Sequence, residues 1–510
     1  MKTRIRQQLA RGKRRIETRL RRAPRYDVED RPVLGRANIR YEISSRQRGI
    51  VRGGVGVFLE LAKQTGLIDA IDRRLKLLKF HAPYHESDHV LNFAFNALCD
   101  GHCLEDIELR RNDEAYLDAL GADRIPDPTT AGDFCRRFRA GHLRLLHAAI
   151  DEARRNVWAK QPDGFFDRAT LDFDGTLVPT DGEKKQGVDI AYDGTWAYHA
   201  LICTLAETGE VLAVVNRSGN RPSHEGAAAE ADRLIPLCRE AGFRRVVLRG
   251  DTDFSQSAHL DGWDADGIEF VFGFDARNNL VLEAETLPKS AWNRLLRPPR
   301  YEVKTEPRRK RRNLKRKIVS ERLFDELRLE SEDVAEFAYR PTACKKTYRM
   351  IVVRKNLAVR VAQQRLFSEE RYFFYITNFS DDITPAEIVF EARGRCQQEN
   401  LIQQLHGGCR ALRAALDTLE ANGASMLMTA LAWNLKAWAA LWLPETPGRW
   451  QEQHREQKRR LLTMEFRTFV NAFVRLPCQI VRTGRRLIYR LLGWNPHLPT
   501  FFRLAQVLRC

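Results

Sequence analysis

The feature that most constrains the fold is a run of apolar strands that begins near Phe165, after a region with helical periodicity. The segments RATLDFDGTLVPT, TWAYHALICTLAETG and EVLAVVNRSGN are rich in apolar and β-branched residues and carry glycine turns. A helical segment, SHEGAAAEADRLIPLCREAG, follows them, and then come the apolar strands RRVVLRGD and IEFVFGFDA. Three consecutive strands, a helix and then alternating strands and helices predict a mixed α/β sheet.

Positive charge is concentrated in two runs. The chain has 510 residues and a formal net charge of +18, and its first 25 residues hold eleven Lys or Arg against one acid, Glu17. The second run, RRKRRNLKRK, spans residues 308–317 and begins with Arg308, Arg309, Lys310, Arg311 and Arg312. Such runs neutralise phosphates and release counterions, so we expect a polyanionic partner. A solvated surface or a disordered tail is the alternative for either run taken alone.

The rest of the chain is organised around the sheet, whose element order is that of the ribonuclease-H-like fold. Before the sheet, apolar residues recur at three- and four-residue steps, which predicts an all-α domain with a cationic surface. After the sheet strands, the chain becomes irregular, strand-rich and basic, which predicts an insertion. The predicted divisions are a basic arm and linker (1–50), a helical DNA-binding domain (51–160), the α/β catalytic domain (161–276 and 371–440), a β-rich basic insertion (277–370) and a helical basic C-terminal region (441–510).

The cysteines and the longest apolar run favour a protein of a reducing cytoplasm. Ten cysteines are scattered without a framework spacing, and we expect reduced thiols. Cys99 and Cys103 flank His102 and leave zinc as an alternative, although no second pair of suitable spacing follows. The run 424–444 approaches the length of a membrane span, but Asn434 and Lys436 interrupt it, so a buried helix is expected and no membrane partner.

Three acidic residues form the predicted catalytic centre. Asp174 is expected at the end of the first strand and Asp251 at the end of the fourth, and these strands are neighbours in a ribonuclease-H-like sheet. Glu399 lies on a predicted helix that can pack across the same edge. Three hard oxygen ligands suit Mg²⁺ or Mn²⁺, and two such ions can activate the attacking oxygen and stabilise the leaving one. Asp253 is the alternative to Asp251, and His199 is expected to pack within its strand.

The order and spacing of these motifs resemble the DDE transposases of bacterial insertion sequences, most closely the IS "thirteen-eighty" branch. The matching segments are LDFDGT, AYHAL, RSGN with SHEGA, and LRGDTDF, and the similarity covers most of residues 50–440. The resemblance implies a metal-dependent transposase that cuts DNA at the transposon ends. Water would free a 3′-hydroxyl there, and that hydroxyl would later attack a target strand.

The family's tyrosine–arginine–glutamate–lysine signature helix falls on Ala392, Arg395, Glu399 and His406 in this chain. The Arg and Glu match, whereas Ala replaces the Tyr and His replaces the Lys. In the family that missing pair helps to hold phosphates of the DNA end, so His406 and full activity are in question. Arg395 lies one helical turn before Glu399 and could clamp a phosphate, with an ordinary surface arginine as the alternative.

The resemblance also implies partners and a role for the insertion. The partners would be double-stranded transposon ends with inverted repeats and target DNA, bound by a homodimer in the bacterial cytoplasm or nucleoid. Asp251 follows Asp174 by 77 residues and Glu399 follows Asp251 by 148, which leaves room for the β-rich insertion. Trp292 in that insertion is a candidate to stack on a base pulled from the duplex, and ordinary packing is the alternative.

Three other functions remain open at the level of sequence. DFDGTL matches the nucleophile loop of haloacid-dehalogenase-type phosphatases, in which Asp172 would form an aspartyl-phosphate and Asp174 would act as general acid. The strand meander that follows argues against that reading, because those phosphatases need a parallel sheet. A transposase-derived DNA-binding protein with impaired catalysis, and a nuclease that never joins strands, are the other two.

Overall fold

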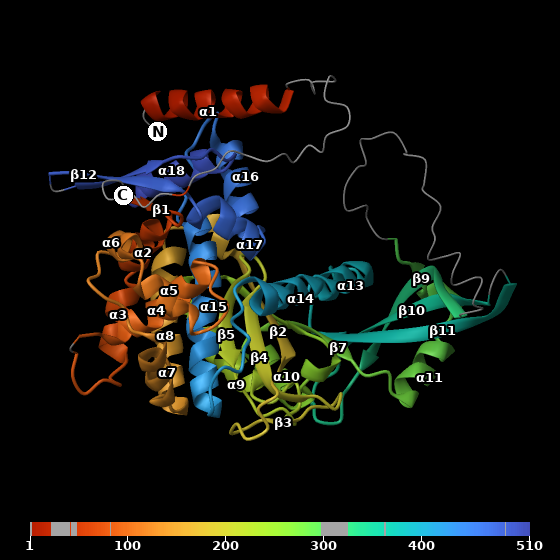
Figure 1. Cartoon of the computed structure of the whole chain (residues 1–510). Helices are drawn as coiled ribbons and strands as arrows, with labels where there is room; N and C mark the ends of the chain where they lie inside the picture. The colour runs from red at the N-terminus through yellow and green to blue at the C-terminus, as the bar shows by residue number, and fades with distance from the viewer. Residues whose placement is uncertain are drawn as a thin grey trace.

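A computed structural model describes residues 3–21, 41, 48–81, 83–296, 325–361, 364–484 and 486–509. The second basic run, with Arg308, Arg309, Lys310, Arg311 and Arg312, lies outside the described residues. The chain forms an α/β structure with one large mixed sheet, as predicted, flanked by helices from both ends of the sequence (Figure 1).

Helices fill the region before the sheet. They are α1 (Thr3–Arg21), α2 (Val55–Gln64), α3 (Leu67–Arg74), α4 (Glu86–Leu98), α5 (Asp106–Arg111), α6 (Glu114–Leu120), α7 (Pro128–Arg136) and α8 (Ala140–Trp158). The start of α7 is set by Asp127, whose side chain accepts a hydrogen bond from the backbone N–H of Thr130 at 2.9 Å. Asp127 is therefore the N-cap of this helix.

The central sheet has ten strands and joins the predicted meander to the insertion. Its strands before residue 300 are β2 (Arg168–Pro179), β3 (Asp189–Ile190), β4 (Trp196–Leu205), β5 (Glu210–Val215), β6 (Arg245–Gly250), β7 (Glu269–Phe274) and β8 (Asn293–Arg294), with α9 (Ala227–Ala241), α10 (Ser257–Ala265) and α11 (Asn278–Thr286) between them. The order is β3-β4-β2-β6-β7-β11-β10-β9-β8, and β5 pairs with β4. Antiparallel β2, β4 and β5 form the meander, and β2, β6 and β7 run parallel.

The strands of the insertion extend this sheet. They are β9 (Asp325–Tyr339), β10 (Tyr348–Val361) and β11 (Gln364–Thr377), which project as a long arm in Figure 1. Residues Phe374–Thr377 of β11 pair with β7, so the arm is joined to the rest of the sheet along the edge of β7. The expected boundary between residues 370 and 371 therefore falls inside a strand.

The C-terminal part contains more than helices. Its helices are α13 (Pro385–Arg393), α14 (Cys396–Gln403), the π-turn η5 (Gln404–Gly408), α15 (Leu419–Leu441), α16 (Gln451–Leu462), α17 (Phe466–Phe469), the π-turn η6 (Val470–Val474) and α18 (Leu498–Val507). A hairpin of β12 (Cys478–Thr483) and β13 (Arg486–Leu491) follows η6, and β1 (Arg48–Ile50) pairs with β12. The region 441–510, predicted to be helical, thus also contains this hairpin, whose two strands flank a turn at Gly484.

The apolar run after Gly423 forms a buried helix, as predicted. Twenty of the 23 residues of α15 are buried, and the helix packs against α4, α7, α8 and β5. Lys436 is fully buried within it and donates a hydrogen bond to the carbonyl oxygen of Leu462 at 2.7 Å. Among the described helices, none is long and apolar enough to cross a membrane.

One buried carboxylate ties the helices to the sheet. Glu210 of β5 is completely buried and accepts hydrogen bonds from Arg154, Trp158, Trp438 and Thr208, at 2.8–3.2 Å. These donors come from α8, from α15 and from the turn before β5. Because all of them converge on one charge, α8 and α15 are fixed against the same strand.

Candidate active site

The first two predicted acids lie at one edge of the sheet. The parallel pairing of β2 with β6 ends where Asp172 meets Arg249, one residue before β6 ends at Gly250. Asp251 follows directly. Asp174 was expected at the end of its strand, but β2 continues beyond it to Pro179. Asp174 lies where β2 passes beyond the end of β6. Both acids therefore emerge where the two strands part.

Arg395 brings all three predicted acids together. Its guanidinium lies 3.0 Å from a carboxylate oxygen of Asp174, 3.8 Å from one of Asp251 and 3.4 Å from one of Glu399. Arg395 immediately precedes α14, and Glu399 lies one turn into that helix, so the two share a face. Asp253 does not contact this arginine; its backbone N–H donates to Asp251 at 3.0 Å.

The single positive charge of Arg395 does not offset the effect of burial on the pKa values of Asp174 and Asp251. Burial raises the pKa of Asp174 to about 6; Arg395 opposes the shift, and Asp251 and Glu399 add to it. Burial also raises the pKa of Asp251, again against the effect of Arg395. One guanidinium thus serves three carboxylates. Crowded acids of this kind are typical of sites that take up further cations.

The donor set fits a hard divalent ion. Three carboxylates offer only oxygen ligands, which Mg²⁺ and Mn²⁺ prefer. Over the described residues, no group of three or more His, Cys, Asp or Glu side chains stands in a ready metal-binding arrangement, and a guanidinium occupies the centre of this cluster instead. The ligand atoms are therefore of the kind that the predicted metal prefers. In this structure the three carboxylates are arranged around the guanidinium of Arg395.

A buried ion-pair network anchors α13, the helix before the one that carries Glu399. Both oxygens of Asp172 accept hydrogen bonds from Arg249, at 2.5 and 2.8 Å, and Asp172 is only 1% exposed. Arg249 also bonds to the carboxylate and the backbone oxygen of Glu391 in α13, and Arg168 pairs with the same carboxylate. Since Asp172 is enclosed and β2 runs antiparallel to β4, the phosphatase alternative is not favoured.

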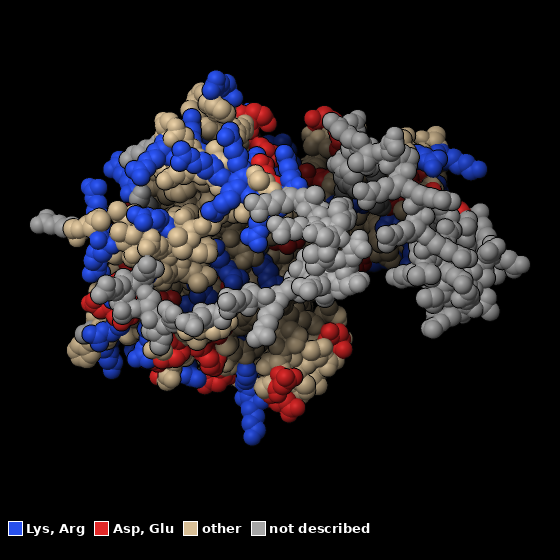
Figure 2. Space-filling model, turned by 45° about the horizontal axis from the view of Figure 1, so that its top comes forward, with Lys and Arg blue, Asp and Glu red and all other residues tan. Residues whose placement is uncertain are grey.

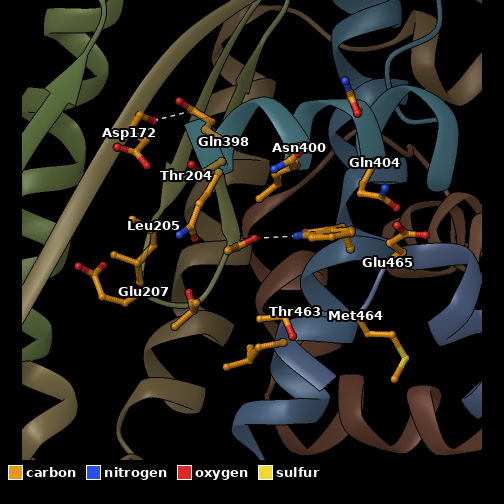
Figure 3. Close-up of a pocket in the computed structure, with 18 residues that line it drawn as sticks. Asp172, Thr204, Leu205, Glu207, Gln398, Asn400, Gln404, Thr463, Met464 and Glu465 are labelled. Atoms are coloured by element: carbon orange, nitrogen blue, oxygen red, sulfur yellow. Dashed lines mark hydrogen bonds between the residues drawn. The ribbon is translucent and has the colours of Figure 1, made fainter. Parts of the chain in front are cut away.

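Gln398 anchors α14, the helix that carries Glu399, to the sheet. It is 2% exposed, and its amide nitrogen donates to the backbone oxygens of Asp172 and Ile202, at 2.8 and 3.2 Å. Figure 3 shows this side chain reaching from α14 to Asp172, beside a cavity of about 660 Å³ behind the helix. Sequence reasoning missed Arg249, Glu391 and Gln398. The signal in the sequence that could have indicated the buried ion pair is Arg249 itself, an arginine within the apolar strand RRVVLRGD.

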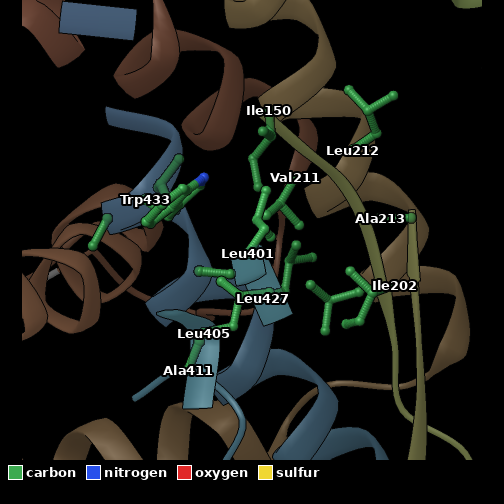
Figure 4. Packing of buried hydrophobic residues seen from close by; sticks show 14 of the residues in the cluster. Ile150, Ile202, Val211, Leu212, Ala213, Leu401, Leu405, Ala411, Leu427 and Trp433 are labelled. Carbon is green, nitrogen blue, oxygen red and sulfur yellow. The ribbon is translucent and has the colours of Figure 1, made fainter. Parts of the chain in front are cut away.

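Apolar packing completes the positioning of α14. Leu401, Leu405 and Leu427 lie together in the core beside Ile202 of β4 (Figure 4). Leu401 is two residues beyond Glu399, so the opposite side of the helix is embedded. The chain turns between α13 and α14 at Gly394, where a Cβ atom would lie 2.5 Å from the guanidinium of Arg249.

The remaining signature positions have different surroundings. Nε2 of His406 lies 2.9 Å from the hydroxyl of Thr176, two residues beyond Asp174, so His406 faces the site. Burial lowers the pKa of His406. Ala392 is 8% exposed and packs in a core cluster with Val247, so its side chain points into the protein.

Trp292 lies outside this cluster. It is half-buried, with the guanidinium of Arg354 4.2 Å from its ring centroid and the ring of Tyr372 6.4 Å away. Its present partners are therefore side chains of the β-arm.

Positive charge is spread over another face. With the top of the molecule turned forward, Figure 2 shows Lys and Arg side chains gathered over the region where α1 and the C-terminal elements lie in Figure 1. Helix α1 has no buried residue, and α16 carries Arg459 and Arg460 in its last turn. This surface suits a polyanion.

Comparison with known proteins shows a family to which most of the chain is matched. A family model described as "Transposase DDE domain group 1" matches residues 43–509. No curated protein matches the chain. Among solved structures, the chain is similar to piggyBac transposase in a synaptic complex with hairpin DNA, determined by cryo-EM. The two are 10% identical, the match covers 84% of each chain, and the TM-score is 0.37.

Proposed function

The chain belongs to the group 1 family of transposase DDE domains, and on that premise we propose that it cuts DNA at transposon ends and joins the freed ends to target DNA. The observation that carries the proposal is the meeting of Asp174, Asp251 and Glu399 around one guanidinium at a sheet edge. We further propose a ribonuclease-H-like core of the "thirteen-eighty" branch, for which the meander, α9 and parallel β6 and β7 provide support.

Asp174, Asp251 and Glu399 would hold two Mg²⁺ or Mn²⁺ ions. When bound, these ions supply Lewis-acid activation of the attacking oxygen and stabilise the leaving oxygen. Arg395 holds the acids together in this structure, and its planar fork suits a bidentate contact with the scissile phosphate. His406, beside Thr176, would contact the same strand. The buried network around Asp172 keeps the acids in register and takes no part in the chemistry.

The partners in this proposal are DNA throughout. The protein would bind inverted-repeat ends and target DNA as a homodimer in a bacterial cytoplasm. Trp292 and the run from Arg308 to Arg312 would contact the transposon end, and the basic surface near α1 would bind phosphates without reading sequence.

The test is cleavage of DNA that carries the element's ends, with Mn²⁺ and the full chain. We expect Asp174→Asn, Asp251→Asn and Glu399→Gln each to lower the cleavage rate at least about a thousandfold, because each removes a ligand charge on which several kcal/mol of transition-state stabilisation depend. Asp253→Asn is the matched control and should retain cleavage. Cleavage that survives Asp174→Asn, or DNA binding by the wild type without any cleavage, would refute the enzymatic proposal.

A further inference from the structure

The hairpin of β12 and β13 has two faces of different character. Its register pairs Ile480 with Tyr489 and Val481 with Ile488, and successive pairs lie on opposite faces of the ribbon. The face of Ile480 packs against the body of the protein beside Ile50 of β1, and both isoleucines are buried. The opposite face, which we call the outer face, consists of the pairs Gln479–Arg490, Val481–Ile488 and Thr483–Arg486.

The arginines of the outer face have no acidic residue beside them. Within the described part of the chain, Arg486 makes no hydrogen bond or ion pair, and Arg490 makes no ion pair and donates one hydrogen bond, to Gln479 at 3.2 Å. On the inner face, by contrast, Arg482 lies 3.8 Å from a carboxylate oxygen of Asp118. The inner arginine therefore contributes to the fold, whereas the charges of the two outer arginines are open to a partner.

The sequence around the hairpin shows the same excess of arginine. Residues 466–510 contain eight arginines, no lysine and no acidic residue. A guanidinium presents a planar fork of donors that matches two phosphate oxygens, whereas an ammonium group acts as a point charge. The composition of this segment therefore favours a partner that is rich in phosphate.

Helix α1 adds positive charge at the same end of the molecule (Figure 1). A half-buried stripe at Ile5, Leu9, Gly12 and Ile16 recurs at steps of three and four residues, and α1 packs against α18. A Cβ atom on Gly12 would lie 3.3 Å from the ring of Trp494, three residues after β13. Helix α1 carries eight Lys or Arg against one acid. The start of the chain therefore adds its charge to that of the C-terminal segment.

The charges of the outer face disfavour a second copy of this chain as its partner. Among the described strands, β13 is at the edge of its three-stranded sheet, and an edge strand is open to pairing. Antiparallel pairing of two β13 strands about Ile488 would place Arg486 of each copy opposite Arg490 of the other. Like charges directly opposite each other destabilise a strand pair. A polyanion would instead neutralise both arginines.

The shape of the hairpin favours a duplex over a single strand. A two-stranded ribbon is of a size that the major groove of B-DNA admits. Single-stranded nucleic acid is bound by stacking on aromatic side chains, and the outer face holds none, because Tyr489 lies on the inner face. The outer face thus combines arginines for phosphates with a ribbon that fits a groove.

We propose that the outer face of the β12–β13 hairpin binds duplex DNA outside the candidate active site, with Arg486 and Arg490 on backbone phosphates. The proposal rests on the proposed function for the presence of DNA as the natural partner. It assigns to the C-terminal part of the chain an anchoring surface that holds the duplex without taking part in the chemistry.

The test is equilibrium binding of a fluorescent 20-base-pair duplex to the full chain, measured by anisotropy at several salt concentrations in a chelating buffer that prevents cleavage. We expect Arg486→Gln with Arg490→Gln to reduce the slope of log affinity against log salt by about 1.8, because each phosphate contact on B-DNA contributes about 0.9. Arg486→Lys with Arg490→Lys keeps both charges and should keep the slope.

Arg244→Gln with Arg245→Gln is the matched control. It removes the same net charge from two exposed arginines at the start of β6, the end of that strand away from Asp251, and should leave the slope unchanged. Circular dichroism checks that both double variants fold. An unchanged slope in the outer-face variant, an equal loss in the control or a larger loss for a single-stranded probe would overturn the proposal.

Two further outcomes separate this proposal from its alternatives. A DNA-free dimer that Ile488→Asp dissociates would assign the edge of β13 to a second copy and overturn the proposal. A slope that depends on Arg486 and Arg490 in a protein that never cleaves would refute the proposed function and leave this surface intact. Cleavage that depends on Asp174, without any effect of the outer face on the slope, would do the reverse.

Discussion

Two carboxylates of the same sheet, Glu210 and Asp174, are surrounded in opposite ways. Glu210 has no exposed surface and accepts four hydrogen bonds from donors on two helices and a turn. Asp174 shares one guanidinium with two other acids and accepts one backbone hydrogen bond, from Gly175. The first cluster is balanced and fixes helices to the sheet. The second cluster has more negative than positive charge, which lowers the stability of the folded protein. Functional sites tolerate this cost when a cationic ligand binds there and balances the charge.

The largest effect on stability should come from the balanced cluster. Glu210→Ala leaves Arg154 buried and removes the acceptor for two indole N–H groups, so we expect the free energy of unfolding to fall by about 3–5 kcal/mol. Urea denaturation followed by tryptophan fluorescence measures the loss. Glu240→Ala is the control, because Glu240 pairs with Arg155 at the exposed surface and should change stability by less than about 1 kcal/mol. A loss below 1 kcal/mol in Glu210→Ala would show that the two clusters do not differ as described.

Removing a charge from the cluster around Asp174 should instead raise the free energy of unfolding at neutral pH. The pKa of Asp174 is raised to about 6, so the folded protein binds this proton more tightly than the unfolded chain does. The stability of the metal-free wild type relative to Asp174→Asn should therefore be highest below pH 4 and fall as pH rises towards 6. At pH 7 we expect Asp174→Asn to be the more stable protein by up to about 3 kcal/mol.

Denaturation at pH 4 and pH 7 in a chelating buffer tests this prediction. A variant that is less stable than the wild type at pH 7 would show that Arg395 fully compensates the acids. Addition of Mn²⁺ should stabilise the wild type more than Asp174→Asn, because only the wild type offers all three ligands.

A smaller effect should follow from loosening α14, the helix that carries Glu399. Gln398→Ala removes both hydrogen bonds from α14 to the sheet, so we expect the cleavage rate to fall about tenfold, equivalent to about 1.4 kcal/mol, with DNA affinity within twofold. Gln403→Ala, on the exposed side of the same helix, should leave the rate unchanged. A loss of affinity rather than rate in Gln398→Ala would mean that this residue contacts DNA.

The smallest effect should come from the signature position that departs from the family. His406→Lys adds a cation beside Thr176, so the slope of log affinity for DNA ends against log salt should steepen by about 0.9, the value for one added phosphate contact. Fluorescence anisotropy between 50 and 200 mM salt measures the slope. An unchanged slope would place this position away from DNA phosphates.

The sequence predicted the mixed sheet because its signals are local. Strand periodicity located β2 and β6, and the mixed sheet that they form is confirmed. The three acids were predicted from motifs and spacing, and their assignment as catalytic residues stays a prediction. Arg249 and Gln398 escaped prediction because their partners, Asp172 and Glu391, are distant in sequence. The pairing of β12 with β1 was missed because it joins segments that are more than 400 residues apart in sequence.

That pairing between β1 and β12 has a consequence for synthesis on the ribosome. Arg48 pairs with Ile480, and Gly53 donates to the carbonyl oxygen of Leu476 at 3.0 Å. At roughly 5–20 residues per second, the early strand would wait about 20–90 s before its partner emerges. The helices that follow β1 must therefore fold in the meantime without this neighbour, and a segment made much later completes the packing around β1.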